Sequence, residues 1–123
     1  MASYSAMRHP EVIGNVLSQS GSYWFYESWT MTALENIFGD SGWLTGQFAS
    51  LPKLPLRFFI EVGKLEQGLA INMVLENRRL RDTLLAKGYS VVYSEYNGGH
   101  DVLYWRNSVA DGLMALIGKT ETK

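Results

Sequence analysis

Tyr89–Tyr96 (YSVVYSEY) leads through Asn97 into Gly98-Gly99-His100-Asp101, and Val102–Ile117 follows. Branched and aromatic residues bounded by glycine are typical of a strand, and the longer amphipathic segment after the glycines indicates a helix. In open parallel sheets, ligands bind at the carboxyl ends of the strands. The pattern therefore places His100 where such a sheet holds its functional groups.

His100 is a candidate proton carrier. An imidazole takes up a proton near pH 7 and returns it later, which acyl transfer requires. The alternative interpretation is a plain strand-to-helix turn, in which the two glycines supply unusual backbone angles and the histidine has no chemical role.

Two other apolar runs predict two more strands, Val12–Ser20 and Leu56–Val62. The second is rich in branched and aromatic residues and is closed by Gly63. Helices are predicted over Met1–Arg8, Trp29–Phe38, Leu69–Ala86 and Val102–Ile117, and a loop over Gly39–Pro55. Strands that alternate with helices at this spacing predict an α/β fold, in which right-handed crossovers build a sheet of three parallel strands.

The last two predicted helices carry apolar residues at helical spacing. Those expected to face the core are Leu69, Met73, Leu80 and Leu84 in the first helix and Val109, Leu113, Leu116 and Ile117 in the second. Gly88 follows the first helix as a helix-ending glycine would.

Composition indicates one small soluble domain over residues 1–123, with residues 118–123 as a frayed tail. The 11 Lys and Arg nearly balance the 12 Asp and Glu, so we expect no nucleic-acid partner. Without cysteine, and with only two histidines outside any metal-binding motif, we expect no metal and no cofactor. No apolar run reaches membrane-spanning length and no secretory signal is visible, so we expect no membrane partner and a cytoplasmic location, with the periplasm as the alternative for a parent protein.

Several stretches, in this order, resemble the C-terminal part of the enterochelin-esterase-like branch of the α/β-hydrolase superfamily. They are HPE (9–11), GNVLSQSGSYW (14–24), LRFFIEVG (56–63), NRRLRD (77–82), GGHD (98–101) and WR (105–106). The resemblance implies a serine ester hydrolase in which His100 is the general base. It also implies an acid on the loop after the preceding strand, where Glu66 is the candidate that would orient the imidazole.

Two other acids are weaker candidates for that role. Glu61 lies inside a predicted strand, so its side chain points to one face of the sheet and not to its end. Asp101 is expected to cap the last helix, because Asp is a preferred residue at that position.

The family's nucleophile elbow, G-x-S-x-G, has no counterpart in this sequence. Ser20 is the replacement we expect, because it ends a strand beside the pocket and is followed by Gly21. The alternative is that the serines near the end of this strand satisfy backbone groups and shape the pocket. Substrate contacts are expected from Ser18, Ser22, Trp24 and Trp105.

A truncated hydrolase of this kind would leave the strand near Val12 unpaired at one edge and Trp24, Phe25, Trp29 and Trp43 uncovered. We therefore expect a homodimer that completes the fold, with or without exchanged elements.

The sequence predicts a small serine-type carboxylic-ester hydrolase that acts on a small-molecule ester. The alternative is a catalytically inactive esterase fragment that serves as a dimeric assembly or aromatic-ligand-binding module. The aromatic run Tyr23–Tyr26 leaves a third function open, the binding of a siderophore or catechol without hydrolysis.

Overall fold

The computed structural model describes residues 1–24, 42–68 and 71–118. Its centre is a parallel sheet with the strand order β1-β2-β3, formed by β1 (Asn15–Gln19), β2 (Arg57–Gly63) and β3 (Ser90–Tyr96). Arg57 pairs with Asn15 on one side and with Ser90 on the other, so the three strands begin level with one another. The α/β fold with three parallel strands is confirmed, and the strand boundaries differ from the prediction by up to three residues.

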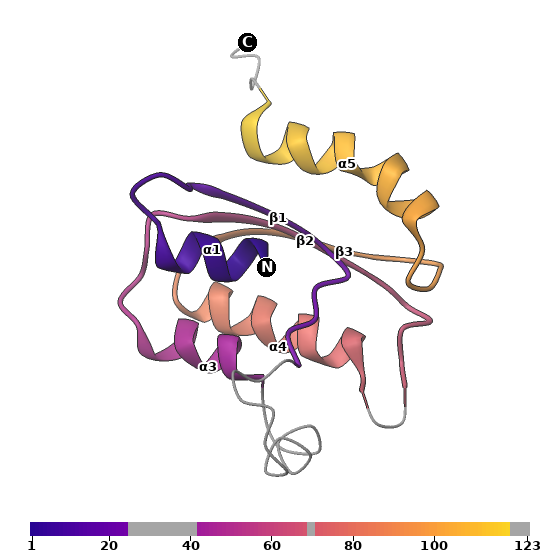
Figure 1. Cartoon of the computed structure of the whole chain (residues 1–123), viewed down its shortest axis with the longest axis horizontal. Helices are drawn as coiled ribbons and strands as arrows, with labels where there is room; N and C mark the ends of the chain where they lie inside the picture. The colour runs from indigo at the N-terminus through magenta and orange to yellow at the C-terminus, as the bar shows by residue number, and fades with distance from the viewer. Residues whose placement is uncertain (25–41, 69–70, 119–123) are drawn as a thin grey trace.

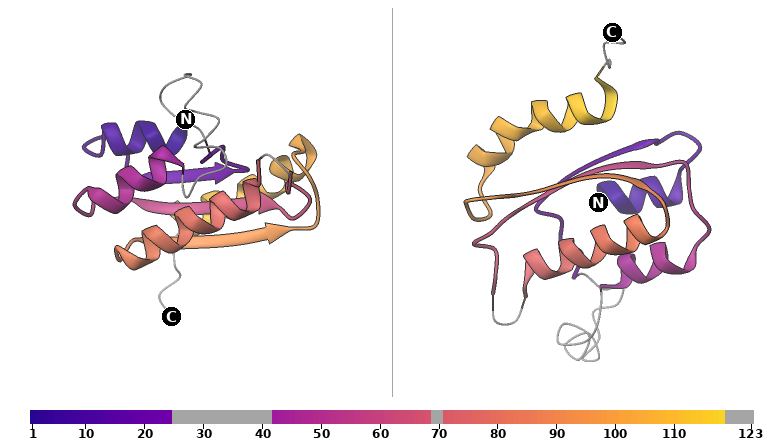
Figure 2. Two further views of the ribbon diagram at one scale, coloured as in Figure 1. Left: turned by 90° about the horizontal axis from the view of Figure 1, so that it is seen from below. Right: turned by 180° about the vertical axis from the view of Figure 1, so that it is seen from behind.

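Helices cover both faces of this sheet, as Figure 1 and Figure 2 show. The helices α1 (Ala2–Arg8), α3 (Trp43–Ser50) and α4 (Met73–Ala86) lie on one face, and α5 (Val102–Ile117) lies on the other. The last helix has the predicted boundaries, and the Asp101 side chain accepts a hydrogen bond from the Leu103 N–H at 2.8 Å. Asp101 is thus the N-cap of α5, as its residue type predicted.

The predicted loop over Gly39–Pro55 is wrong at Trp43–Ser50, which forms α3. Gly46 and the small polar residues of this segment resemble a loop, but Phe48 buries its ring completely. That ring packs edge-on against Phe58 at 5.6 Å and Tyr89 at 6.1 Å between ring centres. Tertiary packing therefore selects a helix that local propensity does not predict.

Helix α4 begins at Met73, four residues later than predicted. Asn72 is its N-cap, and the Asn72 side chain accepts a hydrogen bond from the Leu75 N–H at 2.9 Å. The helix buries Leu80 and Leu84 against the sheet, as their spacing predicted. The predicted core position Leu69, the helix predicted over Trp29–Phe38 and nearly all of the predicted tail lie outside the described residues.

On α5 the prediction of the core face is mostly wrong. Leu116 is buried, but Val109, Leu113 and Ile117 are exposed. The helix packs mainly on β1 and β2 through Gly112, where an added Cβ would lie 2.7 Å from Leu17 Cδ1. This close approach turns Gly112 and Leu116 to the sheet, and the apolar residues on neighbouring helix positions remain at the surface.

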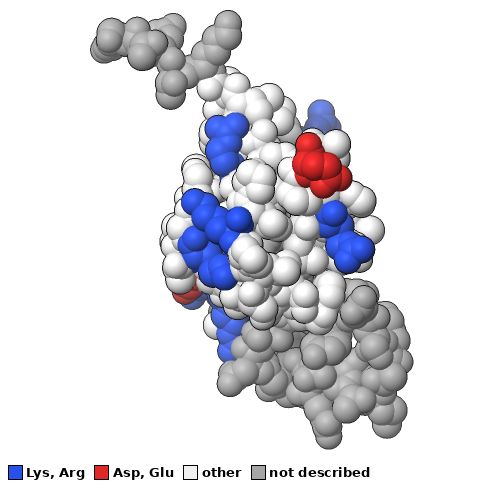
Figure 3. Space-filling view, turned by 90° about the vertical axis from the view of Figure 1, so that its left-hand side faces the viewer, with Lys and Arg blue, Asp and Glu red and all other residues white. Residues whose placement is uncertain are grey.

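The amino ends of the strands lie on the side of the molecule shown in Figure 3, opposite the side where the strands end. Lys and Arg form more groups than Asp and Glu on this surface. Exposed Lys53 and Arg57 belong to the segment that enters β2 there. The basic residues at this end of the strands are therefore remote from the loop that carries His100.

The predicted homodimer stays a prediction. Within the described sheet, β1 and β3 are the outer strands, and Val92 on β3 is exposed together with apolar side chains of α5. In the described ranges, no helix has the length and apolarity needed to cross a membrane.

Candidate active site

The loops that follow β2 and β3 are tied together at the carboxyl end of the sheet. The Lys64 N–H donates to the Tyr96 carbonyl oxygen at 2.9 Å, and the Leu65 N–H donates to the Gly98 carbonyl oxygen at 3.0 Å. Gly63 makes this approach possible, because any side chain there would collide with the Gly98 carbonyl group. The two loops therefore hold Glu66 and His100 at a fixed separation.

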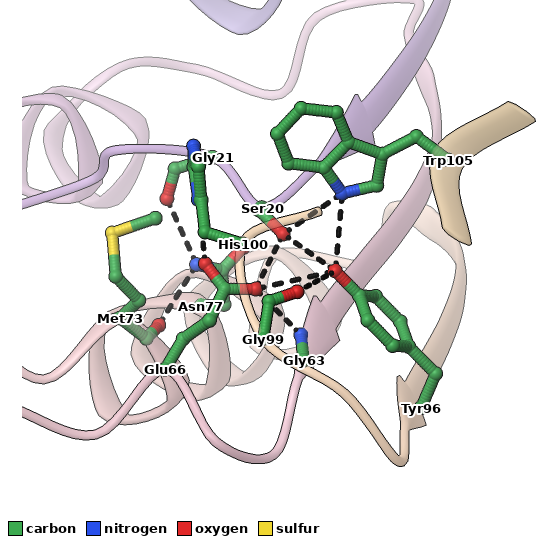
Figure 4. A network of polar contacts seen from close by, with 10 residues as sticks. All are labelled: Ser20, Gly21, Gly63, Glu66, Met73, Asn77, Tyr96, Gly99, His100 and Trp105. Atoms are coloured by element: carbon green, nitrogen blue, oxygen red, sulfur yellow. Dashed lines mark hydrogen bonds and ion pairs between the residues drawn. The ribbon is translucent and has the colours of Figure 1, made fainter. Parts of the chain in front are cut away.

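His100 and Glu66 form the pair that the resemblance implied (Figure 4). The His100 Nδ1 atom lies 2.7 Å from Glu66 Oε2, and the side chains are 58% and 2% exposed, respectively. A carboxylate at Nδ1 favours the tautomer with the proton on Nδ1, which leaves a lone pair on Nε2. Within the described part of the chain, Nε2 has no hydrogen-bond partner, so it is free to accept a proton from an incoming hydroxyl group.

The other carboxylate oxygen of Glu66, Oε1, also accepts hydrogen bonds. Glu66 Oε1 accepts hydrogen bonds from the Ser20 hydroxyl at 2.5 Å and from the Gly63 N–H at 2.8 Å. Burial raises the pKa of Glu66, but hydrogen bonds from Ser20, His100 and Gly63 outweigh it and hold the pKa below its usual value. Glu66 is therefore ionised at neutral pH and acts as an acceptor toward His100.

Trp105 connects α5 to this pair. Its ring lies edge-to-face with the His100 imidazole, with 4.7 Å between ring centres and an interplanar angle of 90°. The Trp105 Nε1–H donates to the Tyr96 hydroxyl at 3.0 Å and to the Ser20 hydroxyl at 3.2 Å. The indole therefore limits the positions that the imidazole ring can take and fixes two hydroxyl groups beside Glu66.

The structure does not bring Ser20 and His100 into hydrogen-bond contact within the described residues. The Ser20 hydroxyl contacts Glu66, Tyr96 and Trp105 instead. Its role as the nucleophile stays a prediction, as do the catalytic roles of His100 and Glu66. Glu61, the weaker candidate for the acid that orients His100, has other partners. Its carboxylate accepts hydrogen bonds from Gln19 at 2.9 Å and from Ser108 at 2.5 Å, under α5.

Tyr96 is a site residue that the sequence analysis missed. Its hydroxyl donates to the Gly99 carbonyl oxygen at 2.9 Å and lies 3.3 Å from Glu66 Oε1. Its ring stacks on Tyr104 with 4.8 Å between ring centres. The available signal was its place as the last residue of a strand, just before the glycine pair.

A pocket of about 460 Å³ lies between the start of α1, the end of β1 and the start of α3. Of the four predicted substrate contacts, Ser18 and Ser22 line this pocket, Trp105 contacts His100, and Trp24 ends the first described segment. The residues that line it are Met1, Ala2, Ser3, Tyr4, Ser18, Gly21, Ser22, Tyr23, Trp43 and Leu44. No cluster of three or more potential metal ligands occurs in the described residues.

The known proteins to which this chain is similar agree with the resemblance carried by the sequence motifs. The chain is 31% identical over 119 residues to the iron(III) enterobactin esterase of Dickeya dadantii (strain 3937), covering 94% of this chain and 26% of that relative. It is 34% identical over 113 residues to the iron(III) salmochelin esterase of Escherichia coli O6:H1, covering 89% of this chain and 26% of the relative. The chain resembles part of an enterobactin esterase. The resemblance predicted from the sequence is therefore confirmed.

The structural comparison agrees with the sequence comparison. A crystal structure of the enterobactin esterase from Shigella flexneri in the presence of 2,3-di-hydroxy-N-benzoyl-glycine matches with a TM-score of 0.69 and 30% identity, covering 92% of this chain and 27% of that one. No protein-family model matches the chain. The chain thus spans about a quarter of the length of these esterases.

Proposed function

We propose that this chain takes part in the hydrolysis of a small-molecule carboxylic ester, with His100 as the general base and Glu66 as the acid that orients it. The observation that carries the proposal is the hydrogen bond of 2.7 Å between His100 Nδ1 and the buried, ionised Glu66. The similarity to enterobactin and salmochelin esterases supports the same chemistry.

In the proposed reaction, His100 Nε2 removes the proton of a hydroxyl group as its oxygen attacks the ester carbonyl carbon. The imidazolium that forms is stabilised by Glu66 through Nδ1–H. When the carbonyl double bond re-forms and the bond to the leaving alcohol breaks, Nε2 returns the proton to the alcohol oxygen. His100 therefore returns to its initial protonation state at the end of the step.

A serine hydroxyl needs a base within about 2.6–3.2 Å to act as a nucleophile. The Ser20 proton is directed at Glu66, so we propose that the hydroxyl activated by His100 comes from another serine or from water. The experiment is to assay p-nitrophenyl ester hydrolysis by the purified chain and to map any fluorophosphonate adduct by peptide mass analysis. Hydrolysis without label on Ser20 supports the proposal, and absent hydrolysis or a label on Ser20 contradicts it.

The second candidate function, binding of an aromatic ligand, is favoured by the pocket of about 460 Å³. Tyr4 and Trp43 line it, with 5.9 Å between their ring centres. An engineered cavity of about 150 Å³ holds benzene, so this volume is sufficient for a substituted aromatic ring. We propose a benzoyl group as the ligand, because a dihydroxybenzoyl compound was present with the similar esterase.

The pocket also offers a hydrogen-bond donor to such a ligand. Tyr23 stays protonated because burial raises its pKa, and its hydroxyl donates to Ser18 Oγ at 2.6 Å. The Ser3 hydroxyl, 2.7 Å from the Tyr23 oxygen, then donates to Tyr23. The hydrogen bonds therefore run from Ser3 to Tyr23 and from Tyr23 to Ser18. Because the Ser18 oxygen only accepts in this arrangement, the proton of the Ser18 hydroxyl is available to an acceptor on the ligand.

Replacement of Ser18 by alanine is expected to weaken binding of 2,3-dihydroxybenzoylglycine about fivefold, the usual effect of one lost hydrogen bond. Isothermal titration calorimetry measures the affinity. Ser50→Ala is the control, because the Ser50 hydroxyl is bonded within α3 to the Gly46 carbonyl oxygen. Equal affinities of the Ser18 and Ser50 variants would refute a role for Ser18 in binding.

A further inference from the structure

We propose that Ser20 is a positioning residue, which acts on His100 through Glu66 by fixing the orientation of the Glu66 carboxylate. This inference rests on the proposed function only in the role given to His100. It assigns to Ser20 a task different from that of the nucleophile, and it follows from the backbone and from the direction of each hydrogen bond around the Ser20 hydroxyl.

The Ser20 backbone has a φ of 51°, the only positive φ of a non-glycine residue among the described residues. Such a conformation is strained for serine and persists where its surroundings impose it. The Ser20 N–H donates to the Glu61 carbonyl oxygen at 2.8 Å, and the Asn77 side chain donates to the Gly21 carbonyl oxygen at 2.9 Å. β2 and α4 therefore hold this residue in the unusual conformation from both sides.

The proton of the Ser20 hydroxyl has one possible direction. An ionised carboxylate only accepts hydrogen bonds and an indole N–H only donates them. Ser20 must therefore donate to Glu66 Oε1, at 2.5 Å, and accept from Trp105 Nε1, at 3.2 Å. The Tyr96 hydroxyl, which also accepts from Trp105, donates to the Gly99 carbonyl oxygen. The Ser20 hydroxyl is thus both a hydrogen-bond donor and a hydrogen-bond acceptor.

These contacts leave Glu66 with one orientation. Oε1 is held by Ser20 and by the Gly63 N–H, and Oε2 then faces His100 Nδ1, as Figure 4 shows. Without the Ser20 hydroxyl, Oε1 keeps the Gly63 N–H at 2.8 Å and the longer contact with the Tyr96 hydroxyl at 3.3 Å, and its shortest hydrogen bond is lost. The carboxylate is then less restrained in rotation about its last bond. We therefore expect loss of this hydroxyl to weaken the bond between Glu66 and His100.

The test variant is Ser20→Gly. Glycine adopts positive φ without strain, so this variant removes the hydroxyl and keeps the backbone conformation. The matched control is Ser108→Ala, because the Ser108 hydroxyl makes the same kind of bond, 2.5 Å long, to the carboxylate of Glu61, which does not contact His100. Thermal unfolding of both variants establishes that they are folded.

The first measurement is the tautomer of His100, read from two-bond ¹⁵N–¹H correlation spectra of the imidazole. We expect the unaltered chain and Ser108→Ala to show the Nδ1–H tautomer, and Ser20→Gly to show a mixture with Nε2–H. The second measurement is ester hydrolysis, where we expect kcat to fall about tenfold in Ser20→Gly with little change in KM, as for a lost hydrogen bond to a charged group.

An unchanged His100 tautomer in a folded Ser20→Gly variant would overturn the proposal. So would a complete loss of hydrolysis in that variant together with an unchanged tautomer, since that is the behaviour of a nucleophile. If the tautomer shifts as expected but the unaltered chain hydrolyses no ester, the positioning role of Ser20 holds and the proposed esterase function fails.

Discussion

Replacement of His100 by alanine is expected to lower kcat/KM for a p-nitrophenyl ester by a factor of about 10² to 10⁴, the usual contribution of a general acid–base group. The reason is that no other described side chain offers a neutral nitrogen base next to Glu66. Purified variants assayed at saturating and at low substrate concentration separate the effect on kcat from that on KM. We expect kcat to carry most of the loss, because proton transfer occurs in the transition state.

His9→Ala is the matched control for this experiment. His9 is the only other histidine of the chain, and it follows α1 near the amino ends of the strands, with Nδ1 at 3.3 Å from Glu11. Both histidines are exposed, so neither variant is expected to unfold the protein. Equal activity of the two variants would show that His100 is not the base.

Replacement of Leu84 by alanine is expected to lower the free energy of unfolding by about 2–5 kcal/mol, the range measured for leucine in protein cores. Leu84 is 0% exposed and belongs to the core between α4 and the sheet, together with Phe58 and Leu80. Because this core sets the distance between α4 and the strands that end at the candidate site, its loss is also expected to lower activity.

Leu85→Ala provides the control for Leu84. The two residues are neighbours on α4, so the substitution changes helix propensity equally, but Leu85 is 50% exposed. Chemical denaturation of both variants gives the two free energies. We expect a loss of less than about 1 kcal/mol for Leu85→Ala, as for most surface substitutions. Similar losses for both leucines would contradict the position of the core described above.

The sequence was sufficient to predict the elements that carry a strong local pattern. β2 and β3 consist of branched and aromatic residues that end near glycine, and α5 has a capping Asp101, so all three were predicted within one residue of their boundaries. α3 was missed because the burial of Phe48 against Phe58 and Tyr89, which are distant in sequence, outweighs its weak local preference for helix.

The exposed face of α5 was mispredicted for a related reason. Helical spacing identifies apolar residues that share a stripe, but it does not show how far the sheet extends beneath the helix. The side of α5 that faces the sheet is set by Gly112, which allows close contact with Leu17 and Phe59. Glycine has no apolar side chain, so a hydrophobic pattern does not reveal this contact. The covered side of the helix could not be read from hydrophobicity alone.

In the candidate site, the family resemblance predicted that His100 and Glu66 act as a pair, and the structure places the two side chains in hydrogen-bond contact. The contacts of Ser20 could not be predicted, because they depend on its positive φ and on Trp105, which is 85 residues away in the chain. Tyr96 was missed since its hydroxyl reaches the site only through the close approach of the two loops.

The central claim is that His100 and Glu66 act as a single catalytic unit, and a double-mutant cycle on ester hydrolysis tests it most directly. His100→Ala, Glu66→Gln and the variant with both changes are compared with the unaltered chain. In the proposed reaction Glu66 acts only through His100, so we predict that the double variant is no slower than His100→Ala alone. Losses in kcat/KM that multiply in the double variant, or an unaltered chain without measurable hydrolysis, would contradict the claim.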